Sequence, residues 1–349
     1  MISAASSVVA APANRVTLRK TLISCAVLVV ALLVVVVLTS LIGSERLPAR
    51  ASLCAIASLG TSTCGLSRDQ FDILFQIRLP RILLAAAVGG SLATAGAGYQ
   101  ALLRNPLAEP YLLGISNGAA VGTMIALIFF GTNQWIRPVV AFTGALLATL
   151  AVYRLARGRA GATPERLILA GVIVTTFLSS VIVFVTTMMD ATRIRSFTFW
   201  LLGDLSGATR ALLPVTITIA IAGALALTLH ARSLNLLMLD ERDAFDLGVE
   251  VGRVRIVVFV VASLLVGSSV AASGSVGYVG LVVPHLARLS LGSDNRISIP
   301  AAALSGALFV IVADTVARTV IAPRELPVGA ITALIGAPLF IYLLKRSHG

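Results

Sequence analysis

Charge is scarce in this chain. Only 12% of its 349 residues are Asp, Glu, Lys or Arg, about half the share found in ordinary soluble domains. Hydrophobic residues make up 58% of the sequence, and the mean hydropathy is +0.98. Because about 20 apolar residues in a helix span the hydrocarbon core of a bilayer, the sequence predicts a membrane protein with no room for a large soluble domain.

Motifs for chemistry are missing as well. There is no GxxxxGK[ST] motif, and the two lysines, Lys20 and Lys345, follow no glycine-rich loop, so the chain cannot bind ATP in the P-loop manner. It has no HExxH motif and no paired CxxC, and its histidines, His230, His285 and His348, are far apart. These absences argue against a metal-dependent enzyme within the membrane.

Acidic side chains are rare within the apolar runs, where Asp314 is the main candidate. Proton-coupled transporters usually carry more such groups, so a channel, or a carrier driven by another subunit, fits better. The net charge of +12 does not indicate nucleic-acid binding, because the arginines are spread between apolar runs and form no single basic face. In a membrane protein this charge indicates topology and contact with anionic lipids.

Ten apolar runs are expected to form transmembrane helices. They cover residues 22–42, 79–101, 112–131, 138–157, 167–188, 210–230, 254–273, 276–292, 298–319 and 328–345. The run 276–292 is the weakest, because Gly277, Gly280 and Pro284 interrupt it. The expected fold class is therefore all-α, a single polytopic transmembrane domain over residues 22–349, preceded by a cytoplasmic tail over residues 1–21.

The first run follows Arg15, Arg19 and Lys20 and so resembles a secretory signal peptide. It is longer than a usual signal-peptide core and has no convincing cleavage site, so we expect a first span that enters from the cytoplasm. Most basic residues then fall on the inner side, which agrees with the positive-inside rule. We expect a multi-pass protein of the cytoplasmic (inner) membrane with both termini in the cytoplasm.

Two segments between spans are unusually long. Ser44 to Ile77 is expected outside and contains Cys54 and Cys64. A disulfide between them would close a short loop in an oxidising compartment, but sequence alone does not fix the geometry. The third cysteine, Cys25, lies in the first span and is expected to be inert.

The second long segment, Ala231 to Arg253, is expected inside. Residues 240–247 carry four acids and one arginine. Asp240 and Glu241 favour a helix N-terminus and Gly248 suits a C-cap, so a short charged helix is predicted. A lipid-surface helix is the alternative, although such helices usually favour Lys and Arg.

Four stretches, in order from about residue 70 to the C-terminus, resemble the FecCD-type permeases of iron-siderophore, haem and cobalamin ABC importers. They are residues 78–81 (RLPR), 104–119 (RNPLAEPYLLGISNGA), 277–288 (GYVGLVVPHLAR) and 325–338, which contains ELPVG and GAP. The resemblance implies two permeases of ten helices each around one pathway, two cytoplasmic ATPases, and an extracytoplasmic substrate-binding protein. The second permease is a copy or a paralogue. No catalysis and no cofactor are expected in this chain.

The resemblance also implies cargo. A ferric siderophore or similar iron chelate is the first expectation, and haem and cobalamin stay open because their permeases share these motifs. A self-sufficient ion-coupled transporter or channel is the alternative from another class, and the charged segment 240–247 argues against it.

Three arginines are expected to receive glutamates of the binding protein, namely Arg78, Arg81 and Arg318. The alternative is that they reach lipid headgroups, and Asp314, at i−4 on the same helical face, could hold Arg318 structurally. The resemblance assigns the helix that couples to the ATPase to residues 240–248, in which the contact residues are expected to be Asp240, Glu241, Arg242, Ala244, Phe245, Leu247 and Gly248.

Two loops are expected to gate the cytoplasmic end of the pathway. The first holds Asn105, Pro106 and Leu107. The second holds Thr163 and Pro164, although these residues also make an ordinary helix start. His285 is expected to be a buried histidine rather than a metal or haem ligand.

Overall fold

The computed structural model describes residues 17–43, 45–131, 135–158, 161–207, 212–239 and 241–347. The elements in chain order are α1 (Leu18–Leu41), α2 (Ala49–Ala57), α3 (Arg68–Asp72), η1 (Ile73–Arg78), α4 (Leu79–Leu102), η2 (Pro110–Leu113), α5 (Ile115–Phe129), α6 (Ile136–Ala156), β1 (Arg157–Gly158), β2 (Gly161–Ala162), α7 (Pro164–Thr186), α8 (Ala191–Leu201), α9 (Leu213–Leu229), α10 (Ala231–Leu237), α11 (Glu241–Asp246), α12 (Val251–Ser273), α13 (Val279–Leu291), α14 (Asn295–Thr319) and α15 (Val328–Ser347).

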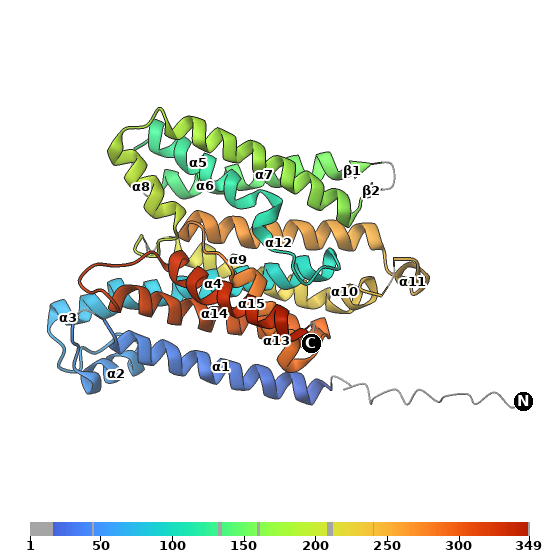
Figure 1. Ribbon diagram of the computed structural model, residues 1–349. Helices are drawn as coiled ribbons and strands as arrows, with labels where there is room; N and C mark the ends of the chain where they lie inside the picture. The colour runs from blue at the N-terminus through green and yellow to red at the C-terminus, as the bar shows by residue number, and fades with distance from the viewer. Residues whose placement is uncertain are drawn as a thin grey trace, which may run out of the picture.

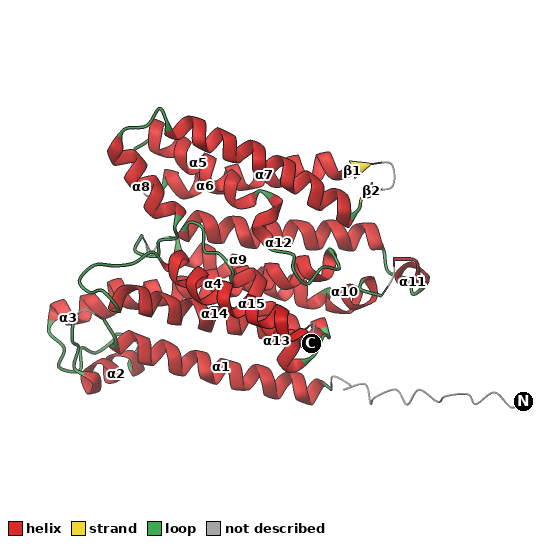
Figure 2. Cartoon of the chain, in the orientation of Figure 1, coloured by secondary structure: helices red, strands yellow, loops and turns green. Residues whose placement is uncertain are grey.

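The long helices run side by side in one bundle (Figures 1 and 2). Each of the ten predicted spans coincides with a helix, namely α1, α4, α5, α6, α7, α9, α12, α13, α14 and α15. Within the described residues six helices are long and apolar enough to cross a membrane, and α9 is continued by α10 after a 54° bend. The predicted all-α polytopic fold is confirmed, and the only paired strands in the described chain are the two-residue β1 and β2.

Helices α4 and α14 form the centre of the bundle, and their backbones touch. A Cβ atom added to Gly89 of α4 would lie 2.1 Å from the carbonyl oxygen of Gly306 of α14, and one added to Gly306 would lie 2.3 Å from that of Gly89. Without aqueous solvent to drive packing, helices in membranes associate through such close approach of small residues. This pair therefore fixes how the two ends of α4 and α14 sit relative to each other.

The two ends of the bundle differ (Figure 1). One end carries α2, α3 and α8, and we call it the disulfide end because Cys54 and Cys64 lie there. The opposite end carries β1, β2 and α11, and we call it the α11 end.

The segment 44–77, expected as a long loop, contains α2, α3 and η1 instead. Ser67 and Gln70 form a capping box that starts α3, and η1 continues into α4 without a break. Leu47, Ala55 and Leu74 form a small core separate from that of the main bundle. The apolar runs here are too short to give a transmembrane signal, which is why a sequence reading by hydropathy missed the helices.

The predicted weakness of the span 276–292 has a structural basis. Helix α12 ends at Ser273 and α13 begins only at Val279, so residues 274–278 are not helical. The Tyr111 hydroxyl lies 2.8 Å from the carbonyl oxygen of Val276 and 2.9 Å from its backbone nitrogen. Irregular backbone is stable at membrane depth when protein groups satisfy it in this way.

Candidate functional site

A cluster of charged side chains lies at the disulfide end, where α4 begins and α14 ends. Arg81, in the first turn of α4, donates from Nε and Nη2 to the carboxylate of Asp314 at 2.9–3.1 Å. Its Nη1 donates to Oε2 of Glu325, in the loop between α14 and α15, at 2.7 Å. Asp314 is 1% exposed, whereas the Glu325 side chain is 48% exposed. Arg81 thus joins one buried and one half-exposed carboxylate.

Arg318 and Arg78 complete the cluster. Arg318 lies one turn after Asp314, with 3.5 Å between Nε and the carboxylate, and it donates to the backbone oxygens of Thr39 and Ile42. The i−4 pairing expected from the sequence is therefore present. Arg78 donates to the backbone oxygens of Ser40 and Glu45.

All three arginines predicted to dock a binding protein are buried, each less than 10% exposed. The structure brings them together from η1, α4 and α14, elements far apart in the sequence. They line one pocket of about 210 Å³, together with Gly43, Glu45, Ile73, Ile77 and Glu325. Desolvated guanidinium groups favour carboxylates through charge and paired hydrogen bonds, so the pocket suits an anionic group.

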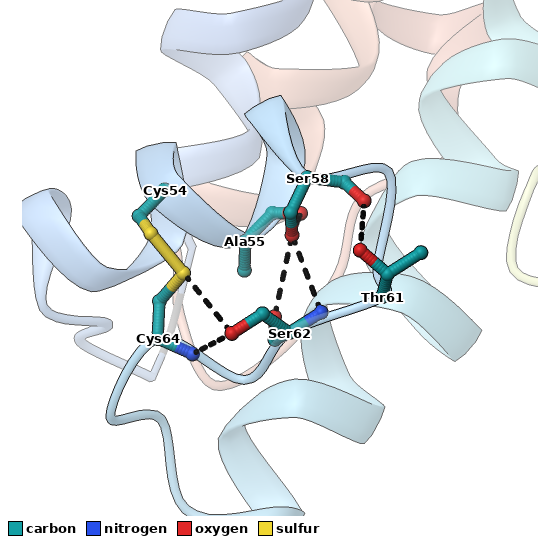
Figure 3. The surroundings of a disulfide bond; sticks show 6 residues. All are labelled: Cys54, Ala55, Ser58, Thr61, Ser62 and Cys64. Carbon is teal, nitrogen blue, oxygen red and sulfur yellow. Dashed lines mark hydrogen bonds between the residues drawn. A yellow bond between two sulfur atoms is a disulfide. The ribbon is translucent and has the colours of Figure 1, made fainter.

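A disulfide joins Cys54 of α2 to Cys64, which lies ten residues further on (Figure 3). The enclosed turn is held by side-chain hydrogen bonds, including Ser58 Oγ to the Ala55 carbonyl at 2.9 Å and Thr61 Oγ1 to the Ser58 carbonyl at 2.7 Å. This cross-linked turn and the small core beneath it shape the surface beside the arginine pocket. Cys25 of α1 lies apart and is half-buried.

Helix α11 protrudes at the opposite end of the bundle (Figure 1). Ala244 is fully buried, whereas Phe245 and Leu247 are 70% and 65% exposed. The chain turns out of the helix through Gly248, whose φ is +83°, as expected for a glycine C-cap. Arg242 is exposed, and Asp240 lies outside the described residues. Two large apolar side chains thus stand in solvent at the tip of the molecule.

The segment after α4, predicted to form a gate, is an irregular turn at the α11 end. The Asn105 side-chain oxygen accepts from the backbone nitrogen of Leu107 at 2.9 Å, and Pro106 and Leu107 are exposed. A pocket of about 320 Å³ lies beside this turn, lined by Gln100, Arg104, Asn105, Pro106, Met238, His285, Arg288, Leu289 and Ser293. His285 is half-buried, with its ring edge toward Phe340.

The second expected gate segment starts α7. Pro164 is the first helical residue and Thr163 occupies the N-cap position, but its side chain makes no capping hydrogen bond. Arg255 of α12 donates to the Ala162 carbonyl at 2.9 Å. Helix η2, which follows the Asn105 turn in the sequence, packs against α7, because a Cβ added to Gly171 of α7 would lie 2.6 Å from the backbone oxygen of Leu112.

Sequence reasoning missed two residues that the structure makes prominent. Glu325 lies in the ELPVG stretch, but no role was predicted for it. It contacts Arg81, which is 244 residues away in the sequence. Glu109 stands in the second quoted stretch, and its carboxylate accepts from the backbone nitrogen of Tyr278 at 3.3 Å. Burial raises the pKa of Glu109. Their presence in the quoted motifs was the only local signal.

The described residues hold no group of three His, Cys, Asp or Glu side chains placed to bind a metal ion. Two features instead lie at opposite ends of one bundle. One is the pocket lined by buried arginines, and the other is the exposed apolar helix tip formed by Phe245 and Leu247.

Comparison with known proteins identifies the family to which this architecture belongs. Residues 25–346 match the model of the FecCD transport family. A cobalamin import system permease, BtuC of Halobacterium salinarum, is 41% identical over 273 residues, covering 78% of this chain and 73% of the relative. A hemin transport system permease, HmuU of Yersinia pestis, is 40% identical over 283 residues, covering 80% and 84%.

A solved structure points the same way. It is described as an inward-facing conformation of an ABC transporter of the metal-chelate type, and it superposes with a TM-score of 0.81 at 31% identity. The match covers 92% of this chain and 98% of the solved chain. By sequence over most of its length and by fold, the chain belongs to the FecCD transport family, the permease subunits of ABC importers.

Proposed function

We propose that this chain is the permease for a ferric siderophore or a similar iron chelate. Two permeases, identical or paralogous, form one pathway across the cytoplasmic membrane. A substrate-binding protein delivers the cargo to the disulfide end, and a pair of ATPase subunits acts on the α11 end. The observation that carries the transport part of this proposal, as distinct from the choice of cargo, is the placement of an arginine pocket and an exposed apolar helix tip at opposite ends of one bundle.

The arginine pocket supports docking of a binding protein that presents acidic side chains. Arg78, Arg81 and Arg318 converge on one recess, and paired charges at an interface steer encounter and fix orientation more than they add affinity. The disulfide of Cys54 and Cys64 fits this assignment, because disulfides persist on the oxidising side of a membrane. The disulfide end therefore faces outward in this proposal, with both chain termini in the cytoplasm.

Helix α11 supports coupling to an ATPase. Phe245 on the helix and Leu247 just after its end are exposed anchors, and Ala244 is buried against the bundle. A helix that enters a groove on a partner needs this arrangement of apolar anchors and a polar rim. The Asn105–Leu107 turn and the Thr163–Pro164 segment lie at the same end, where they close the pathway.

Haem or cobalamin is the alternative cargo. The two relatives described above are named as permeases for cobalamin and for hemin, which favours a haem or cobalamin importer of the same family. These cargoes share a metal held in an organic chelate, so the permease fold alone does not separate them.

Competition in a reconstituted system separates them. The permease, its ATPase and its binding protein are placed in liposomes, and ATP-driven uptake of a radioactive ferric siderophore is measured against excess unlabelled haem or cyanocobalamin. We expect uptake that neither competitor reduces. Uptake of haem or cobalamin in place of the siderophore would overturn the cargo assignment and leave the permease assignment intact.

A further inference from the structure

An acidic side chain of this chain, Glu325, already contacts an arginine of the arginine pocket. Of the carboxylates that contact its arginines, Asp314 is 1% exposed and bonded to Arg81 by three hydrogen bonds. Glu325 makes a single contact, from Oε2 to Arg81 Nη1 at 2.7 Å, and its side chain is 48% exposed. The two carboxylates on one guanidinium therefore differ sharply in how firmly they are held.

The buried positive charge of the pocket exceeds its buried negative charge, and the remaining acidic side chains lie at its rim. Of the three buried guanidinium groups, those of Arg81 and Arg318 pair with one buried carboxylate, Asp314. The third, Arg78, donates to backbone oxygens. The other two acids, Glu45 and Glu325, lie at the mouth of the pocket. The Nε atom of Arg318 is buried and makes no hydrogen bond, and its ion pair with Asp314 is long, at 3.5 Å. A buried cation without full compensation is costly, so the pocket accepts a carboxylate at its mouth.

We propose that Glu325 is a placeholder carboxylate, which occupies Arg81 in the undocked permease and is displaced by an acidic side chain of the docking protein. The inference rests on the proposed docking function. Displacement is inexpensive because a half-exposed ion pair is weak, and the incoming carboxylate replaces the charge that leaves. Asp314 stays in place and keeps Arg81 oriented throughout the exchange.

The position of Glu325 gives the exchange a structural consequence. The next residue, Leu326, donates its backbone N–H to the Ala317 carbonyl at 3.0 Å, and Val328, the first residue of α15, donates to the Gly203 carbonyl at 3.1 Å. Glu325 thus lies in the loop between α14 and α15, three residues before α15 begins. Its release from Arg81 loosens the connection between α14 and α15 when the partner binds.

The test compares two rim acids in the same pocket. Glu325→Gln and Glu45→Gln each remove one negative charge. Glu45 bonds Arg78 through its backbone oxygen, and its carboxylate acts on Arg78 through charge rather than through a hydrogen bond, so it serves as the control for the directly bonded Glu325. The affinity of the cognate binding protein is measured by surface plasmon resonance on the permease–ATPase complex in nanodiscs, at several salt concentrations. Thermal unfolding of each variant verifies that the complex is intact.

We expect Glu325→Gln to tighten docking about three- to fivefold and to steepen its salt dependence, because docking then creates an ion pair instead of exchanging one. Glu45→Gln should change the affinity less than twofold, roughly the effect of a general change in charge. Equal effects of the two variants, or weaker docking by Glu325→Gln, would overturn the placeholder.

A third variant separates this inference from the docking proposal. Arg81→Met should weaken docking at least tenfold if the pocket receives the partner. If Arg81→Met has that effect while Glu325→Gln has none, docking stands and the placeholder fails. If neither variant changes the affinity, the docking pocket itself is wrong.

Discussion

At the scale of single residues, Asp314 organises the disulfide end. Its carboxylate is almost completely buried and lies within 3.5 Å of both Arg81 and Arg318. Removing one partner of a buried ion pair leaves the others uncompensated, which costs far more than the pair contributes net.

Asp314→Asn should therefore lower the free energy of unfolding by about 3–5 kcal/mol. The measurement is thermal or denaturant unfolding in nanodiscs, with Glu325→Gln as the matched control. Because Glu325 is half exposed, that control should cost less than about 1 kcal/mol. Equal losses in the two variants would contradict the central role of Asp314.

Gly43 is a second residue that decides the geometry of the pocket. A Cβ atom at this position would lie 2.5 Å from Nη2 of Arg78, so the guanidinium lies flat against the glycine. Gly43→Ala should displace Arg78 and destabilise the protein by about 1–3 kcal/mol.

Gly252→Ala in α12 is the control, because a Cβ atom there meets nothing within 4 Å and alanine favours a helix. Differential scanning fluorimetry of both variants checks the expectation. A Gly43→Ala protein as stable as Gly252→Ala would show that Arg78 is not held in this position.

At the scale of elements, α14 is anchored at the α11 end by its N-cap. Asp294 accepts from the backbone nitrogen of Arg296 at 2.9 Å and from the Asn235 side chain of α10 at 2.7 Å. Hydrogen bonds from the Arg296 side chain are the main cause that lowers the pKa of Asp294 to about 2. This cap ties α14 to the helix that precedes α11.

The lowered pKa of Asp294 determines how the stability of the protein changes with pH. The cap stabilises the protein fully above the usual pKa of 3.8, and the contribution is lost as the pH falls toward 2. Asp294→Asn keeps a side chain that can cap the helix but removes the charge that pairs with Arg296, so it should cost about 1 kcal/mol at pH 7, and most of the gap to the wild type should close at pH 2. Thermal unfolding at the two pH values measures it, and a gap of constant size would refute the assignment.

Helix α11 carries the second prediction at this scale. Replacing Phe245 and Leu247 together by Ala should weaken binding of the ATPase at least tenfold without loss of stability, because both side chains are exposed and large apolar anchors dominate interfaces. Co-purification and affinity measurements check it. Leu59→Ala, at an 87% exposed leucine of the opposite end, should leave ATPase binding unchanged. Unaltered binding by the double variant would exclude α11 as the contact.

At the scale of the whole molecule, hydropathy predicted the bundle but not its ends. Ten apolar runs correspond to ten helices, including α13 despite Pro284 within it. Helix α8 was missed because its short sequence carries Arg193 and Arg195 and gives no apolar run. Its one local signal is Asp190, whose side chain caps the helix by accepting from Arg193.

The charged site was predicted in part. The i−4 pair of Asp314 and Arg318 follows from helical geometry, and both residues were identified. The contact of Arg81 with Asp314 spans 233 residues, and no local pattern specifies such a pairing. It depends on how α4 packs against α14, which the glycine contacts determine. Family resemblance supplied the arginines and helical spacing supplied Asp314 as a partner of Arg318, whereas only the structure supplied the partners of Arg78 and Arg81.

In the proposed function, this bundle imports its cargo by using an ATPase bound at the α11 end. The most direct test is uptake into proteoliposomes that hold the permease and its ATPase, with the loaded binding protein outside and ATP inside. We predict uptake that requires ATP and falls to background when Phe245 and Leu247 are both replaced by Ala. Uptake without ATP, driven by an ion gradient and unaffected by the two substitutions, would contradict it.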